Sequence, residues 1–239
     1  MRWLVQVPRL YHVYKSSNQI SSFGDMIRNI FAPLMEITLG QTQDPALEYF
    51  LAAVVGFDSV DDESIPEMEL LHAHMPSPEH YTAPHNPPYA YWMYYMHANL
   101  CVLNRLRAER GLNTFQFRPH SGEAGDVDHL ISTFLLAHHI NHGILLRKNS
   151  VLQYLYYLSQ IGVAVSPLCN SKIFLDCKRN PFHKFFQVGL NVSLSTDGPL
   201  MLLVTTGTSP PTVSCALPPR TGPATAMHAA AGRRPVMSR

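Results

Sequence analysis

The second half of the chain repeats short apolar segments at a regular pitch. Segments typical of buried strands occupy four places: 114–120, the residues around Ile140, 162–166 and 191–195. Their ends fall near residues 120, 142, 166 and 197. This pitch leaves room for one helix between successive strands, which is typical of parallel βα units.

The segments between these strands have the spacing of helices. Apolar residues recur at helical intervals in 127–137 and in 151–158, where Ser150 is the predicted N-cap. A further helix is predicted to start at Asn180-Pro-Phe and to stop at Gly189.

The first half fits the same scheme with longer insertions. A strand is predicted at 3–7 and helix at 23–39, while 51–56 is either a helix end or a strand leading into 57–63. Residues 64–88 contain six prolines and no period, so we expect a long loop there. Pro88 then opens a helix over 89–110. This helix carries a run of aromatic residues, namely Tyr89, Tyr91, Trp92, Tyr94 and Tyr95. The run could stack on a ligand, but packing in the core is the favoured interpretation.

Six strand candidates in residues 1–199 predict an α/β fold, a partial (β/α)8 barrel of the TIM type with about six of its eight strands. An open doubly wound sheet is the alternative. It is weaker, because no glycine-rich phosphate loop follows any of the strands.

Composition divides the chain near residue 200. The sequence is 46% hydrophobic and 15% charged, with a net charge of +1, which is typical of a globular protein. Residues 200–239 nevertheless hold four Arg, six of the 19 prolines and no acidic residue. We therefore expect a folded domain at 1–199 and a basic, Pro/Ala/Thr-rich tail at 200–239 that is disordered.

The same features exclude several classes of protein. The near-neutral charge argues against a nucleic-acid or membrane-surface partner. No apolar window is long enough for a transmembrane helix, and the N-terminal apolar run is too short for a signal peptide. The four cysteines show no pairing pattern, so a reducing, cytoplasmic setting is expected.

Polar residues with catalytic potential follow four of the predicted strands. His120 and Glu123 follow the first, His142 follows the second, Ser166 follows the third and Asp197 follows the fourth. In a βα barrel the strand ends share one face, where catalytic residues collect. Two imidazoles, a glutamate and an aspartate on one face would suit a metal-activated water with a separate acid and base.

Several segments carry a more specific resemblance. Pro119-His-Ser-Gly-Glu-Ala-Gly125, Ile140-Asn-His-Gly143 and Ser193-Leu-Ser-Thr-Asp-Gly-Pro199 resemble the signature segments of the adenosine/AMP deaminase superfamily. Arg2-Trp-Leu-Val-Gln-Val-Pro-Arg9 and Gly56-Phe-Asp-Ser-Val-Asp-Asp-Glu-Ser64 resemble AMP deaminases in particular. The similarity covers residues 2–199 and corresponds to the C-terminal catalytic region of that family, truncated at both ends.

The resemblance implies a function and a set of roles. His120 and Asp197 would be ligands of a catalytic Zn²⁺, His142 would hold or deprotonate the attacking water, and Glu123 would protonate the purine at N1. AMP would be hydrolysed to IMP and ammonia, in purine nucleotide interconversion and IMP salvage, by a homotetramer in the cytosol. The signature of cytidine-type deaminases is absent from the sequence.

Two departures from the family pattern limit this reading. The family takes two further zinc ligands from a His-x-His, and the one such pair in this sequence, His72-Ala-His74, falls in the long loop, where we expect it to be solvated. Gly198 stands where the family has a base-contacting aspartate, so no substrate-binding residue is assigned. We therefore expect the isolated chain to be inactive. The alternative is a non-catalytic fragment that associates with intact deaminase subunits.

Overall fold

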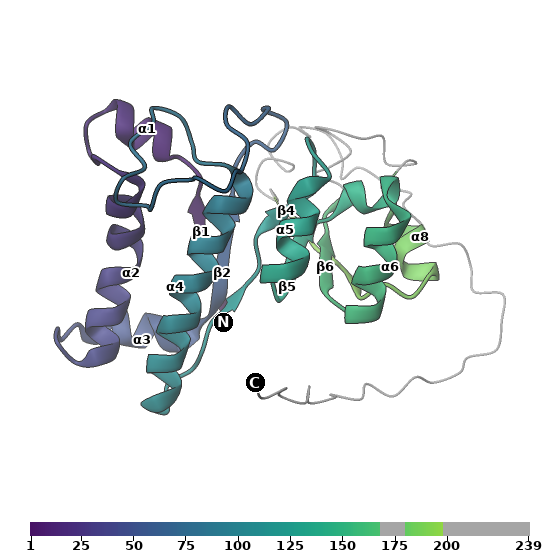
Figure 1. The fold of residues 1–239 in the computed structure, drawn as a ribbon. Helices are drawn as coiled ribbons and strands as arrows, with labels where there is room; N and C mark the ends of the chain where they lie inside the picture. The colour runs from purple at the N-terminus through teal and green to yellow at the C-terminus, as the bar shows by residue number, and fades with distance from the viewer. Residues whose placement is uncertain (168–179, 198–239) are drawn as a thin grey trace, which may run out of the picture.

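The computed structural model describes residues 1–167 and 180–197, and every strand in these ranges runs parallel to its neighbours (Figure 1). One sheet has the order β1-β2-β3 and the other has the order β4-β5-β6-β7. The strands are β1 (Trp3–Pro8), β2 (Val54–Val60), β3 (Gln116–Phe117), β4 (His120–Ser121), β5 (His139–His142), β6 (Gly162–Val165) and β7 (Val192–Leu194).

The two sheets join where β3 passes into β4. Arg118 N donates to Phe57 O at 2.8 Å on one side, and Asn141 N donates to Pro119 O at 2.9 Å on the other. The predicted strand at 114–120 is therefore one extended segment that is interrupted at Pro119, because proline has no N–H to give to a ladder. With that segment counted once, all six predicted strands are confirmed.

The order of the strands distinguishes the two folds considered from the sequence. In both sheets neighbouring strands follow chain order, without the reversal that defines a doubly wound sheet. Parallel strands that follow chain order and are joined mainly through helices have the arrangement of βα-barrel units. The predicted parallel α/β character is thus observed, and the strand order is that of a βα barrel and not of a doubly wound sheet.

Helices connect and cover these strands, with α2 and α4 against β1 and β2, and α5 and α6 against β4 to β6 (Figure 1). Each of the two groups encloses its own apolar core. The helices are α1 (Tyr11–Ser16), α2 (Phe23–Leu39), α3 (Pro45–Ala53), α4 (Tyr89–Glu109), α5 (Asp128–Leu136), the 3-10 helix η1 (Ile144–Lys148), α6 (Ser150–Ser159) and α8 (Phe182–Gln187).

Several local predictions can be compared with these helices. Residues 51–56 were predicted to be either a helix end or a strand, and they contain both, since α3 ends at Ala53 and β2 begins at Val54. The loop at 64–88 has no helix or strand, as expected. The predicted cap of α6 was wrong by one position: Asn149, not Ser150, accepts hydrogen bonds from the first backbone N–H groups of the helix.

The aromatic run of α4 packs into the first core. Tyr89, Tyr91 and Trp92 are buried, and Trp92 Nε1 donates to Ser59 Oγ at 2.9 Å. Tyr94 is exposed. Core packing is thus confirmed for the three buried rings.

Two predictions concern residues outside the described ranges, namely the disordered tail at 200–239 and the substitution at Gly198. Within the described ranges, no helix has the length and hydropathy needed to cross a lipid bilayer.

Candidate metal centre and active site

The strand ends bring His120, His142 and Asp197 together. His120 opens β4, His142 ends β5, and Asp197 lies just after β7. One ligand atom from each of the three side chains lies within 4.8 Å of the other two, and the imidazole rings are 4.6 Å apart between centroids. Both histidines are buried and Asp197 is exposed, so the cluster has one side open to solvent.

Asp58 fixes the orientation of His120. Its Oδ1 accepts hydrogen bonds from His120 N and from His120 Nδ1, both at 3.0 Å, and its Oδ2 accepts one from Gln6 Nε2 at 3.2 Å. With Nδ1 donating to a carboxylate, Nε2 of His120 is the nitrogen left to bind a metal. Asp58 therefore lies where a carboxylate that supports a metal-ligating histidine would lie.

The local electrostatics favour a cation. Burial lowers the pKa of His120, but the hydrogen bond to Asp58 and the negative charges of Asp58, Asp197 and Glu123 outweigh burial and raise it. Two imidazoles and a carboxylate also form a donor set that suits Zn²⁺. The residues present therefore fit a zinc ion.

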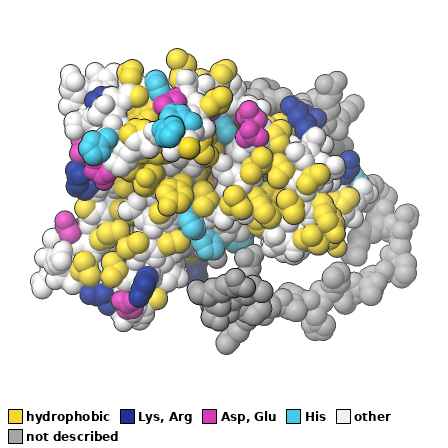
Figure 2. All heavy atoms as spheres, in the orientation of Figure 1, with side chains coloured by type: hydrophobic (Ala, Val, Ile, Leu, Met, Phe, Trp, Pro, Cys, Tyr) yellow, Lys and Arg dark blue, Asp and Glu magenta, His cyan; other side chains and the backbone are white. Residues whose placement is uncertain are grey.

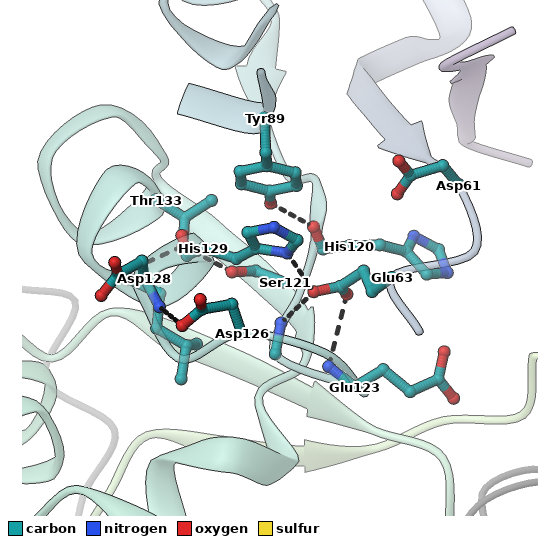
Figure 3. A network of polar contacts seen from close by, with 12 residues as sticks. Asp61, Glu63, Tyr89, His120, Ser121, Glu123, Asp126, Asp128, His129 and Thr133 are labelled. Carbon is teal, nitrogen blue, oxygen red and sulfur yellow. Dashed lines mark hydrogen bonds and ion pairs between the residues drawn. The ribbon is translucent and has the colours of Figure 1, made fainter. Parts of the chain in front are cut away.

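Glu123 lies beside this cluster in the loop that follows β4. Its Oε1 is 3.4 Å from His142 Nδ1, so the two predicted proton-transfer groups are neighbours. The backbone of the loop is held by Glu63, whose Oε2 accepts from Gly122 N at 2.7 Å and whose Oε1 accepts from Glu123 N at 3.3 Å (Figure 3). All four residues predicted for the site thus converge.

His142 itself has an unusual backbone. Its φ of +69° lies in the left-handed region, which non-glycine residues rarely adopt, and Gly143 follows with φ of +59°. A Cβ on Gly143 would lie 2.8 Å from the side chain of Val163. Backbone strain of this kind is typical of functional sites, and here it turns the chain sharply where β5 ends.

Two supporting carboxylates, Asp58 and Glu63, were not singled out from the sequence. Both belong to the acidic segment at 56–64, in which Asp58 lies in the buried strand β2 and Glu63 follows its end, and that position was the signal available. Their partners lie about 60 residues further along the chain, so the sequence did not reveal the pairing. His72 and His74, by contrast, are exposed in the long loop, as predicted.

Comparisons with known proteins show the family of the chain. A family model described as AMP deaminase matches residues 1–209. The chain belongs to the AMP deaminase family. It is 56% identical to an AMP deaminase of Schizosaccharomyces pombe over 205 residues, which are 86% of this chain and 24% of that protein. It is 52% identical to AMP deaminase 3 of Homo sapiens over 200 residues, 84% of this chain and 26% of that protein.

The chain spans about a quarter of the length of these AMP deaminases. Among solved structures, it matches an adenine deaminase from Arthrobacter aurescens at 19% identity and a TM-score of 0.43, over 70% of this chain and 41% of that one. It also matches an N6-mAMP deaminase from Arabidopsis at 13% identity and a TM-score of 0.44, over 82% of this chain and 42% of that one.

Proposed function

We propose that this chain supplies the zinc site and the acid–base pair of an AMP deaminase, which hydrolyses AMP to IMP and ammonia. The observation that carries the proposal is the convergence of His120, His142 and Asp197 within 4.8 Å, with Glu123 beside His142. These are the residues on which the family resemblance places the chemistry. Family membership supports AMP as the substrate.

In this proposal, His120 and Asp197 hold the zinc, and Asp58 keeps His120 in the tautomer that can bind it. Bound zinc lowers the pKa of its coordinated water toward neutrality. His142 is close enough to both ligands to hold that water and to take up its proton.

Glu123 performs the complementary proton transfer. When the water oxygen adds to C6 of the purine, electron density moves onto N1, and the Glu123 carboxyl donates a proton there. The C6–N bond then breaks as the exocyclic nitrogen gains the proton that His142 took from the water, and ammonia leaves. The 3.4 Å separation between Glu123 Oε1 and His142 Nδ1 supports this pairing of the two groups.

The proposal also predicts how much the isolated chain can do. Catalytic zinc sites have three protein ligands. In this proposal only His120 and Asp197 are ligands, because His142 acts on the attacking water. The one His-x-His of the sequence, His72-Ala-His74, lies exposed in the long loop. We therefore expect the chain alone to bind zinc weakly and to be inactive.

A chimera tests the function directly. Residues 1–197 would replace the matching segment of the Schizosaccharomyces pombe AMP deaminase, and ammonia release from AMP and zinc content would be measured. We expect activity, and we expect a Glu123→Gln chimera to keep its zinc and lose turnover. An inactive chimera that binds zinc and is folded would refute the proposal. Co-purification of the inactive chain with the intact enzyme would instead favour a non-catalytic partner.

The resemblance further leads us to propose a cytosolic homotetramer that acts in IMP salvage. Exposed apolar side chains on α5 and α6 support self-association, since such patches mark interaction surfaces (Figure 2). They are Ile131, Leu135, Val151, Tyr154 and Leu158. Light scattering of the chimera and cell fractionation test these two points, and a monomer would contradict the first.

A further inference from the structure

A second buried polar cluster adjoins the metal centre. It consists of His129, Glu63, Glu67, Tyr89 and Arg9, and we refer to it as the His129 cluster. Figure 3 shows His129, Glu63 and Tyr89 beside the loop that carries Glu123. His129, Glu63, Tyr89 and Arg9 are all buried. The roles proposed above for the zinc ligands and the acid–base pair leave His129 without an assigned function.

His129 and the Glu123 loop share one carboxylate. Glu63 Oε2 is 2.9 Å from His129 Nδ1 and also accepts from Gly122 N at 2.7 Å (Figure 3). The other oxygen of the same carboxylate accepts from Glu123 N at 3.3 Å. A movement of the Glu63 side chain would therefore release both backbone N–H groups at once.

The position of His129 is itself fixed from several sides. Its ring stacks on the Tyr89 ring, with centroids 3.9 Å apart and an angle of 9° between the planes. Its Nε2 lies 3.5 Å from Glu67 Oε1. Tyr89 is held in turn, because its hydroxyl donates to His120 O at 2.5 Å and Arg9 lies over its ring at 5.2 Å.

We propose that His129 is a positioning residue, which acts through Glu63 to hold the Gly122–Glu123 backbone so that the Glu123 carboxyl faces His142. The assignment deepens the proposed function and rests on it for the role of Glu123 as the proton donor. The positioning itself is a property of the described residues and can be measured without turnover.

Electrostatics show why a histidine suits this place. A buried carboxylate is costly unless it is paired and hydrogen-bonded. Glu63, Glu67 and Asp61 surround His129 with negative charge, and Arg9 supplies positive charge to the same cluster. Burial lowers the pKa of His129, but hydrogen bonds and charges from Glu63 and Glu67 outweigh it and raise the pKa to about 9. The imidazole is thus charged at neutral pH and opposes the charge of Glu63.

If His129 had a purely structural role, its contact with Glu63 would hold α5 in place without affecting Glu123. A pH titration separates the two roles. In ¹⁵N NMR spectra of the full chain, the Gly122 and Glu123 amide signals are followed from pH 6 to 10. We expect both to shift with a midpoint near pH 9, in step with the His129 ring. Titration of the ring with no response at either amide would overturn the proposal.

Two variants keep the test independent of that titration. His129→Asn retains a donor near the position of Nδ1, whereas His129→Leu removes it. We expect amide hydrogen exchange at Gly122 to rise tenfold or more in His129→Leu and to stay within about threefold of wild type in His129→Asn. His12→Asn, the same substitution at an exposed histidine of the neighbouring 430 Å³ pocket, is the control and leaves exchange unchanged. Equal exchange in all four proteins would refute the proposal.

Kinetics in the chimera complete the test. We expect His129→Leu to lower kcat at least tenfold with unchanged zinc content and KM, and His129→Asn to restore most of kcat. An active chimera whose kcat is insensitive to His129→Leu would overturn the positioning role. An inactive parent chimera would refute the proposed function instead, and the amide measurements would still decide whether His129 controls the Glu123 backbone.

Discussion

The raised pKa of His129 makes the stability of the fold depend on pH. His129 has an ordinary pKa of 6.5 and a pKa of about 9 in the folded chain, since Glu63 and Glu67 outweigh the opposing effect of burial. At about 1.4 kcal/mol per pKa unit, this difference corresponds to about 3 kcal/mol. Because the folded pKa is the higher one, the contribution is complete below about pH 6.5 and disappears as the pH rises through about 9.

Urea unfolding of wild type and His129→Asn at several pH values measures this contribution. Trp92 is fully buried and reports loss of the core by its fluorescence. The series stays between pH 6 and 9.5, because burial, followed by the charge of Glu63, raises the pKa of Tyr89 and adds a separate pH dependence at higher pH. A chelator in all samples removes any contribution from bound metal.

The quantity compared is the difference in unfolding free energy between wild type and His129→Asn. We expect this difference to be about 3 kcal/mol larger at pH 6 than at pH 9.5. His12→Asn, at an exposed position, should run parallel to wild type throughout. Parallel curves for wild type and His129→Asn would refute the reasoning, because they would mean that Glu63 and Glu67 do not stabilise the charged imidazole.

Three further predictions concern the site. Asp58→Asn removes the carboxylate that orients His120, the proposed zinc ligand, so zinc affinity should fall about 10- to 100-fold in a chelator competition. Glu123→Gln in the chimera should lower kcat by about 10² to 10⁴ in an ammonia-release assay with zinc content unchanged, and normal turnover would contradict its role as the acid. Gly125→Ala should destabilise the chain by more than Gly40→Ala: both have positive φ, but only at Gly125 would the new Cβ meet a backbone oxygen, that of Glu63, at 1.8 Å. Gly40→Ala should cost about 1 kcal/mol in thermal unfolding, and equal losses would contradict the close approach.

Elements with a strong local pattern could be predicted from the sequence. The helix at 89–110 and the strands at 3–7 and 162–166 follow from apolar spacing, turn residues and prolines, which act within a few residues. Where two local signals compete, boundaries shift. The cap of α6 moved to Asn149, because its side chain reaches two N–H groups of the first turn.

The face that a helix buries was less predictable. In α5 the apolar residues Ile131 and Leu135 are exposed, whereas His129 and Thr133 are buried. Thr133 Oγ1 lies 2.7 Å from Ser121 Oγ, and His129 contacts Glu63, so this helix turns a polar face toward the strand ends. The hydrophobic pattern of the helix carries no information about that contact.

The sequence by itself determined the succession of strands and helices and the residues that close each strand. It predicted that His120, Glu123, His142 and Asp197 lie together, because parallel strands present their carboxyl ends on one face. Only the tertiary structure decided which groups support them. Asp58 meets His120 across 62 residues and Glu63 meets His129 across 66, through contacts that depend on how β2 and the residues directly after it pack against later parts of the chain. Such contacts set tautomers, charges and loop positions, and no local pattern encodes them.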